Sequence, residues 1–378
     1  MIDAVTRVIR RKQRRSRFFG LDALHIDLWL VGALCVIMLG GLVVLYSAAG
    51  ESTFMVEAQA LRFAMALVLM IAIAQIPPAV MVRWTPLIYV VVVALLVAVA
   101  ALGYHAMGAQ RWLIIPGIGR FQPSELMKIV MPLTLATYLS RRSLPLSWLD
   151  LLVCLILLMV PVALIMDQPD LGTAMLVTFG GCFVILFAGI SWRLIGLCAL
   201  VVAAALPLLW FNMYDYQQQR VMTFLSPETD PLGAGWNIIQ SKTAIGSGGI
   251  FGKGWTHGSQ SHLQFLPESH TDFIVAVLAE EFGLVGVCLL LLGYLVVVFR
   301  GMILASRAQD TFGRLAAGSL ALIFFIYVVV NIGMVSGLMP VVGVPLPLIS
   351  YGGTASVTLL AGFGILMSIG TQRRLVSR

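Results

Sequence analysis

The stretch LWLVGALCVIMLGGLVVLYSA, residues 28–48, decides the fold class because it is apolar from end to end and carries no charged side chain. A helix of about 20 apolar residues crosses roughly 30 Å of hydrocarbon. Similar runs recur almost to the C-terminus, and the chain of 378 residues is 60% hydrophobic but only 11% charged. Soluble domains carry about a quarter charged residues. The sequence therefore predicts an all-α polytopic membrane protein with no soluble domain.

The apolar runs form one membrane domain, residues 27–370, with a basic arm at 1–26 and a short tail at 371–378. The one long hydrophilic stretch, 214–271, separates the seventh and eighth helices, and loops of this length are usually functional or disordered. Its glycine and aromatic residues favour an ordered loop with a short helix near 236–244. We expect about ten transmembrane helices, at 27–48, 61–76, 85–103, 124–140, 149–166, 171–189, 194–213, 272–299, 314–338 and 351–370.

Basic residues mark the cytoplasmic side. Most of the 24 Lys and Arg residues fall in the arm, the tail and the loops that lie inside if the N-terminus is cytoplasmic, and positive charge favours cytoplasmic loops. Both termini are therefore expected in the cytoplasm, which places the long loop in the periplasm. A basic arm beside the first span is typical of a topology signal that contacts anionic lipid, so we expect membrane lipids and no nucleic acid as partners.

A polar cluster, QRWLIIPGIGRFQPSELMK at 110–128, precedes the fourth helix on the outer side. Its Pro123-Ser124 pair predicts a helix start with Ser124 as N-cap and Glu125 near the positive end of the helix dipole. Glu125 and Lys128 share a helix face, and charges inside a membrane are usually paired. The pair either fixes helix packing or lines a cavity for an anionic headgroup, and the residues leave both readings open.

Two more polar sites are expected on the same side. The turn DQPD at 167–170 either binds a cation, or pairs with Arg111 or Arg120, or is ordinary turn chemistry. Asp272 stands where the long loop becomes the eighth helix, and it either caps that helix or has a chemical role.

The eighth helix, 272–299, would run about 42 Å at 1.5 Å per residue. This exceeds the hydrocarbon thickness, so Glu280 and Glu281 in its first turns are expected at the outer interface. The segment PVVGVPLPLIS at 340–350 is rich in proline. It predicts an irregular loop, which a membrane tolerates only where protein covers it.

Several blocks of the sequence resemble one family. The run NIGMVSGLMPVVGVPLPLISYGGTA, residues 331–355, is similar to the signature of the SEDS proteins (shape, elongation, division and sporulation). Further blocks in family order extend the resemblance from about residue 109 to 370, and DPLGAGWNIIQSKTAIGSGGIFGKGW and SWRLIG favour the elongation branch over the division branch. These blocks are RFQPSELMK, QPDLGTA, GWNIIQSK, GIFGKGW and FLPESHTDFIVAVLAEE.

The resemblance implies a ten-helix fold with both termini inside, and peptidoglycan glycosyltransferase activity on lipid II in the bacterial inner membrane during cell elongation. It implies a divalent cation, Mg²⁺ or Mn²⁺. The implied partners are a class B penicillin-binding protein, bound through its transmembrane helix, and other membrane proteins of the elongation complex. Asp272 matches the family's essential aspartate, and Trp112, Glu125 and Lys128 match further residues that the family needs.

Chain growth of this kind joins a sugar 4-hydroxyl to an anomeric carbon that carries a lipid pyrophosphate. The reaction needs a base, charge stabilisation for the pyrophosphate, and a lipid groove beside a wet cavity. Asp272 is expected to be either the base or a metal ligand. The residues expected to bind substrate, with the cations serving phosphate oxygens, are Trp112, Arg111, Arg120, Glu125, Lys128, Lys242 and Lys253.

Two other functions compete with this one. A transporter that flips lipid II would also have many spans and intramembrane charges, and a non-catalytic scaffold would only recruit the penicillin-binding protein. The polar clusters gather on one side of the membrane, which speaks against a translocation path. An essential carboxylate on the outer face would be surplus to a scaffold.

Overall fold

The protein was analysed as a computed structural model. The structure describes residues 25–106, 109–115, 119–190, 215–226, 228, 234–259 and 268–371, together with positions 194, 196, 197, 200, 204, 210 and 211. Most of the expected seventh helix, 194–213, lies outside the described residues, as do nearly all of the basic arm and the C-terminal tail.

Helices make up most of the described chain, and seven of them are long and apolar enough to cross a membrane. These seven are α2 (Leu28–Ala48), α3 (Thr53–Ala74), α4 (Pro78–Leu102), α6 (Trp148–Asp167), α12 (Ile274–Ser306), α13 (Thr311–Val335) and α14 (Gly353–Thr371). The other helices are α5 (Pro123–Leu139), α7 (Leu171–Phe187), α9 (Asp215–Leu225) and α10 (Ala234–Gly248). The chain is therefore a multi-pass membrane protein, with the expected short loop helix present as α10.

Two helices begin earlier than the sequence predicts. α3 starts at Thr53 instead of residue 61, and α4 starts at Pro78 instead of 85. Charged side chains stand near these starts, Glu57 in α3 and Arg83 in α4. Hydropathy detects only the apolar part of a helix that lies in the hydrocarbon. It therefore does not detect helical turns that extend toward water.

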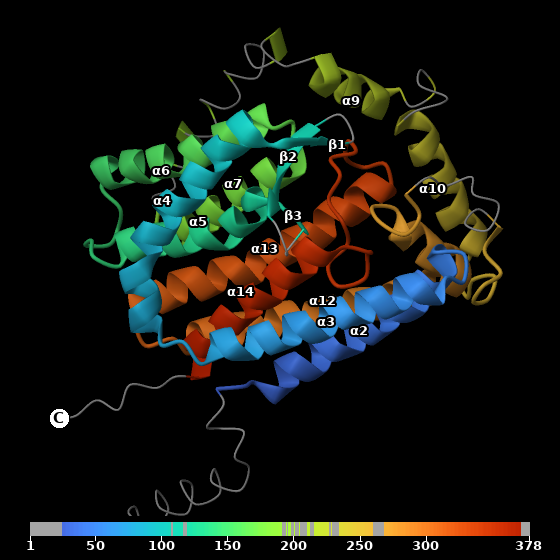
Figure 1. The fold of residues 1–378 in the computed structure, drawn as a ribbon, viewed down its shortest axis with the longest axis horizontal. Coiled ribbons are helices and arrows are strands. Elements are labelled where there is room, and N and C mark those ends of the chain that lie inside the picture. The colour runs from blue at the N-terminus through green and yellow to red at the C-terminus, as the bar shows by residue number, and fades with distance from the viewer. Residues whose placement is uncertain are drawn as a thin grey trace, which may run out of the picture.

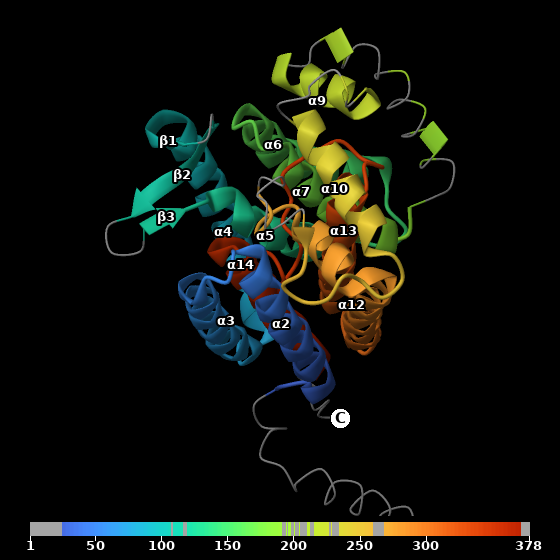
Figure 2. The ribbon, with the colours of Figure 1, turned by 90° about the vertical axis from the view of Figure 1, so that its right-hand side faces the viewer.

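A small sheet between α4 and α5 adds to the expected all-α architecture. Its three strands are antiparallel in the order β1 (Tyr104–Ala106), β2 (Ala109–Ile115) and β3 (Gly119–Phe121), and Figure 2 shows the sheet standing beside the helices. β1 and β3 have three residues each, which is too short to show an alternating pattern. The sheet carries the QRW and GRF parts of the polar cluster, so strand pairing brings these two parts of the chain together.

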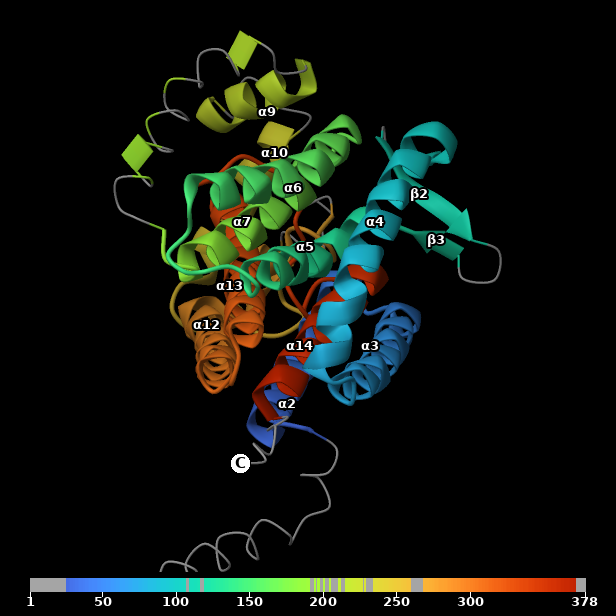
Figure 3. The same cartoon turned by 90° about the vertical axis from the view of Figure 1, so that its left-hand side faces the viewer.

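The helix core lies around α13 and α14. In the most apolar stretch of each of these helices, 72% and 67% of the residues are buried. α13 packs against α5, α7 and α12, while α14 packs against α3; Figures 1 and 3 show both helices inside the bundle. In the corresponding stretches of α3 and α4, only 22% of the residues are buried. Their exposed apolar faces are suited to lipid, because the bilayer replaces the covering protein.

α12 is broken, in contrast to the continuous eighth helix that the sequence predicts. Gly283 has φ 64° and ψ −163° within it, and the loop 249–254 supplies the hydrogen bonds that the break frees. Leu284 N and Val285 N donate to Gly249 O and Ile250 O at 3.0 and 3.1 Å. A Cβ at Gly283 would meet Gly252 N at 2.4 Å, so only glycine allows the loop to dock.

The two described ends of the chain meet at one end of the molecule. Thr371 Oγ1, at the end of α14, donates to His25 O just before α2 at 3.2 Å. α9 and α10 lie at the opposite end (Figure 1). The contact places the starts and ends of the membrane domain on the same side, as the charge pattern requires.

Candidate active site

Asp272 lies in the turn that leads into α12. The N-cap of α12 is Phe273, and no side chain caps this helix. Asp272 therefore does not act as the helix cap. Asp272 lies in this turn and is only partly accessible.

The signature segment holds the backbone of the two residues that precede Asp272. Ser350 Oγ donates to Thr271 O at 2.5 Å, and Tyr351 N donates to His270 O at 2.8 Å. Leu346 N donates to Ser350 Oγ at 2.8 Å. The irregular loop expected at 340–350 is confirmed, because no helix or strand forms between α13 and α14. Through these hydrogen bonds the loop holds the turn that carries Asp272.

Asn331 completes this fixation from α13. Its Nδ2 donates to Asp272 O at 2.9 Å and to Val344 O at 2.7 Å, and the residue is fully buried. Both partners are carbonyl oxygens, so the amide nitrogen must face them. A single side chain therefore ties the aspartate turn to the signature loop.

Burial raises the pKa of the Asp272 carboxyl to about 6. The nearby Glu268 carboxylate raises this pKa as well, and the Arg220 guanidinium on α9 opposes both effects. Gly343, with φ 72°, lies beside the carboxyl, since a Cβ there would be in contact with Asp272 Oδ2 at 3.6 Å. A carboxyl that titrates near neutral pH is suited to general base catalysis.

Glu125 and Lys128 form a buried pair at the start of α5. Lys128 Nζ lies 2.5 Å from Glu125 Oε1, and the two residues are only 5% and 7% exposed. Thr358 Oγ1 on α14 donates to Glu125 Oε2 at 3.1 Å. The N-cap of α5 is Gln122 rather than Ser124, so the expected cap is wrong by two residues: Pro123, which needs no N–H partner, takes the first helical position.

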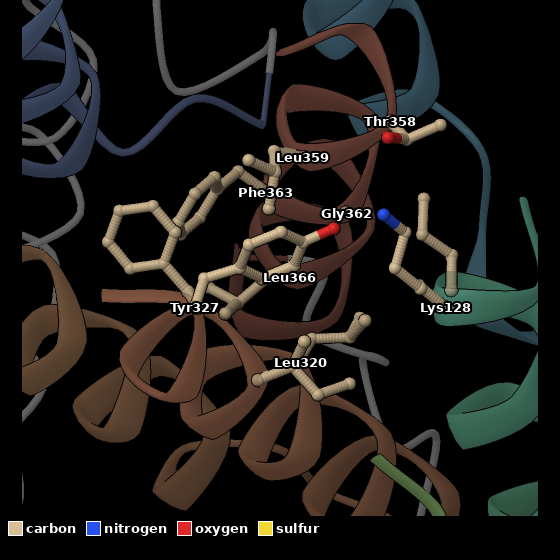
Figure 4. A pocket seen from close by; sticks show the side chains of 11 residues that line it. Lys128, Leu320, Tyr327, Thr358, Leu359, Gly362, Phe363 and Leu366 are labelled. Carbon is tan, nitrogen blue, oxygen red and sulfur yellow. The ribbon is translucent and has the colours of Figure 1, made fainter. Parts of the chain in front are cut away.

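A small cavity adjoins this pair (Figure 4). The Lys128 ammonium points into it and lies 4.9 Å from the centre of the Tyr327 ring. The cavity holds about 30 Å³ and is otherwise lined mainly by apolar side chains of α13 and α14. A space of this size admits water rather than a pyrophosphate. In this conformation the pair joins α5 to α14 and borders a water-sized space.

Arg111 connects the sheet to the turn between α6 and α7. Its Nε donates to Gln168 O at 3.1 Å, and its Nη2 donates to Pro169 O. Asp170 accepts from Thr173 N at 3.2 Å, which caps α7, and from Gln122 Nε2 at 2.7 Å. The expected link between Arg111 and this turn exists, but it runs through backbone carbonyls, while Asp170 has the ordinary chemistry of a cap.

The remaining site candidates occupy different surroundings. Trp112 is half-buried on β2 opposite Tyr104. Arg120 lies on β3 opposite Ile114, and its side chain falls outside the described residues. Lys242 is exposed on α10 against Gly337 at the end of α13.

Lys253 has a partner within the protein. Its Nζ lies 2.6 Å from Glu280 Oε1, and the same oxygen accepts from Ser259 N and Oγ, both at 2.9 Å. Glu281 accepts from Ser47 Oγ of α2. Glu280 and Glu281 are 0% and 1% exposed, so both side chains face protein, and their place at the depth of the outer interface stays a prediction. The break in α12 and the docked loop cover them with protein.

Gln59 and Asn331 are polar positions whose part in the site the sequence did not reveal. Fully buried Gln59 on α3 accepts from Gly352 N at 3.3 Å, and Arg62 lies 4.5 Å above the Tyr351 ring. Both hold the far end of the signature segment. The available signal was a polar residue within an apolar helix, which usually marks packing against another polar group.

Comparison with known proteins places these features in a family. The chain matches the profile of the family FTSW_RODA_SPOVE, described as "Cell cycle protein", over residues 22–375. Peptidoglycan glycosyltransferase MrdB of Escherichia coli K12 is 54% identical over 358 residues, which cover 94% of this chain and 96% of MrdB. Probable peptidoglycan glycosyltransferase FtsW of Trichlorobacter lovleyi is 38% identical over 298 residues, which cover 78% of this chain and 77% of that protein.

Solved structures give the same picture. A chain from a study entitled "Structural coordination of polymerization and crosslinking by a peptidoglycan synthase complex" is similar with a TM-score of 0.79 and 33% identity. The match covers 91% of this chain and 97% of that one. Thermus thermophilus rod shape determining protein RodA is similar with a TM-score of 0.69 and 31% identity, over 91% of this chain and 96% of RodA.

Proposed function

This chain belongs to the cell cycle protein family whose label combines FtsW, RodA and SpoVE, and we propose that it polymerises lipid II at the outer face of the bacterial inner membrane during cell elongation. It is a peptidoglycan glycosyltransferase, as its relatives at 54% and 38% identity are named. The observation that carries the proposed mechanism is the position of Asp272: it is a partly buried carboxyl with a raised pKa, and the signature segment holds its backbone and that of Thr271.

In the proposed reaction Asp272 accepts the proton of the acceptor sugar's 4-hydroxyl. The hydroxyl oxygen forms a bond to the anomeric carbon of the donor, and the bond from that carbon to the lipid pyrophosphate breaks. The electron pair leaves with the pyrophosphate. No residue needs to form a covalent intermediate, so one displacement inverts the configuration at the anomeric carbon.

Cationic side chains are proposed to stabilise the departing pyrophosphate. Arg220 is suited to this because its charge already acts on Asp272, and exposed Lys242 stands on the neighbouring α10. The sheet would contribute Arg111, Trp112 and Arg120. Glu125, Lys128 and Lys253 would support the substrate site from within the protein, since each is already paired there.

The acidic groups near Asp272 could supply some, but not all, of the ligands of a divalent cation. In the described chain no three His, Cys, Asp or Glu side chains come together as a metal cage, but Asp272 and Glu268 lie close enough for their charges to interact. Mg²⁺ is commonly held by one or two carboxylates together with substrate phosphates. As the alternative to the role of base, we propose that Asp272, with Glu268 beside it, would hold Mg²⁺ or Mn²⁺, and the cation would neutralise pyrophosphate charge.

The proposed partner is a class B penicillin-binding protein, bound through its transmembrane helix, with other elongation proteins nearby. A similar chain comes from a study of a peptidoglycan synthase complex, which supports such a partner. The lipid-facing half of α12 exposes a continuous apolar face, including Leu292, Leu295 and Phe299 at 58%, 53% and 70%. Such a face is suited to a second transmembrane helix.

Purified protein given lipid II and its partner would test this function. A ladder of glycan strands on a gel is expected. Transfer of lipid II between the leaflets of a vesicle, with no glycan strands formed, would identify a flippase instead. Neither activity, with the partner still bound, would identify a scaffold.

A further inference from the structure

A groove opens where four cytoplasmic ends meet. The turn between α5 and α6 and the turn between α12 and α13 both lie at the end of the molecule opposite α10 (Figure 1). Between them is a cavity of about 300 Å³, ten times the size of the space at Lys128. Its lining residues are Leu144, Phe187, Met302, Ala305, Ser306, Thr311, Arg314, Leu315 and Gly318.

Polarity changes along this groove in one direction. On α13, Thr311 and Arg314 come first, and Leu315 and Gly318 follow toward the middle of the membrane. At 1.5 Å per residue, Gly318 lies about 6 Å deeper than Arg314. A Cβ at Gly318 would lie 2.9 Å from the Phe187 ring, so glycine lets that ring form the apolar wall. The Arg314 cation lies at the mouth of the groove and the apolar walls lie deeper. A membrane lipid has the same order, with its headgroup at the surface and its acyl chains below.

Unlike Arg142 and Arg300, Arg314 at the mouth of the groove has no carboxylate among the described residues to neutralise it. Arg142 lies 3.3 Å from Asp150, and Arg300 lies 2.7 Å from Asp27. Within the described chain no carboxylate comes within 4.0 Å of the exposed Arg314 side chain. The adjacent Asp310 carboxylate instead accepts from Gly313 N at 2.8 Å and caps α13.

We propose that this groove binds an anionic phospholipid of the cytoplasmic leaflet. Its phosphate lies on the Arg314 guanidinium, with the Thr311 hydroxyl beside it, and an acyl chain lies along Phe187, Met302 and Leu315. The solvent at this depth is lipid, so an open apolar groove fills with an acyl chain. An anionic headgroup is favoured because Arg314 lacks a counter-charge, and basic residues near the surface attract anionic lipid.

The site is tested by native mass spectrometry of the full-length protein released from bilayers with equal phosphatidylglycerol and phosphatidylethanolamine. The wild type should retain phosphatidylglycerol preferentially. Arg314→Gln should lower this preference about five- to tenfold, as one surface cation predicts. Arg307→Gln, which removes an equally exposed arginine outside the groove, should leave it unchanged.

A second variant tests the apolar part of the groove. Ser306 is exposed at the end of α12, so Ser306→Trp fills the groove without disturbing the core and should remove bound lipid of both kinds. Equal phosphatidylglycerol on the wild type and Arg314→Gln would overturn the proposal. So would displacement of the lipid by the penicillin-binding partner, which would make the groove a helix-docking site. Neither result depends on glycosyltransferase activity.

Discussion

Asn331 is the residue on which the position of Asp272 depends most directly. Its two amide hydrogens serve the carbonyls of Asp272 and Val344. In Asn331→Asp a carboxylate of the same shape faces these two oxygens and repels them. Leaving a buried carbonyl unpaired costs about 1–3 kcal/mol. We expect kcat for strand synthesis to fall at least about tenfold, measured per folded molecule.

Ser319→Ala is the matched control for Asn331. Ser319 is equally buried on the same helix and donates to Gly180 O at 2.8 Å, but it lies far from the aspartate turn. Its loss should lower the melting temperature without lowering kcat. Equal kcat for the two variants would show that Asn331 contributes only to stability.

The rate of strand synthesis should depend on pH through the titration of the Asp272 carboxyl. Its pKa is about 6, and a base must be deprotonated, so the rate should fall as pH drops through about 6. Glu268→Gln removes a charge that raises this pKa and should move the fall in rate to lower pH. Arg220→Gln removes the charge that lowers it and should move the fall in rate to higher pH. Shifts of the same sign in both variants of the purified enzyme would contradict this electrostatic account.

At the scale of elements, the break in α12 organises the outer half of the molecule. The loop 249–254 binds the freed backbone, and Lys253 and Ser259 bind Glu280. Gly283→Ala would strain a backbone at φ 64° and bring a Cβ within 2.4–2.5 Å of the loop backbone. We expect a loss of ~2–4 kcal/mol, visible as faster proteolysis of the loop 249–259.

Gly293→Ala provides the comparison on the same helix. Its added Cβ would lie 3.4 Å from the side chain of Ile37, a contact that a small adjustment accommodates. This variant should resist proteolysis as the wild type does. Equal cleavage of the two variants would show that the docked loop does not depend on the break.

Sequence reasoning located most spans because each apolar run is long, and it located α10 and the irregular loop from their glycine and proline residues. It missed the sheet, in which β1 and β3 are too short for a pattern. It also missed the break at Gly283, which depends on a loop docking from elsewhere. At the site it identified the Glu125–Lys128 pair from helical spacing. Asn331 and Gln59 could not be assigned, because their partners are backbone carbonyls and amides distant in sequence.

At the scale of the whole molecule, the two ends have different chemistry. The sheet, α9, α10 and the turn before α12 belong to one end, while the contact between His25 and Thr371 belongs to the other. Positive charge assigns this second end to the cytoplasm. Cysteine at Ser247, exposed in the last turn of α10, should react with an impermeant thiol reagent outside spheroplasts, and cysteine at Gln309 should not. The reverse labelling would invert the membrane orientation and remove the outer-face reaction.

The central claim is that the Asp272 carboxylate takes part in the chemistry. Asp272→Asn keeps the shape of the side chain and the backbone contacts with Asn331 and Ser350, but it removes the charge and the basic oxygen. The measurement is glycan strand synthesis from lipid II by the purified variant bound to its penicillin-binding partner. We predict normal folding and partner binding with strand synthesis abolished. Near-normal synthesis by the Asn variant would contradict the assignment of Asp272 as base or metal ligand.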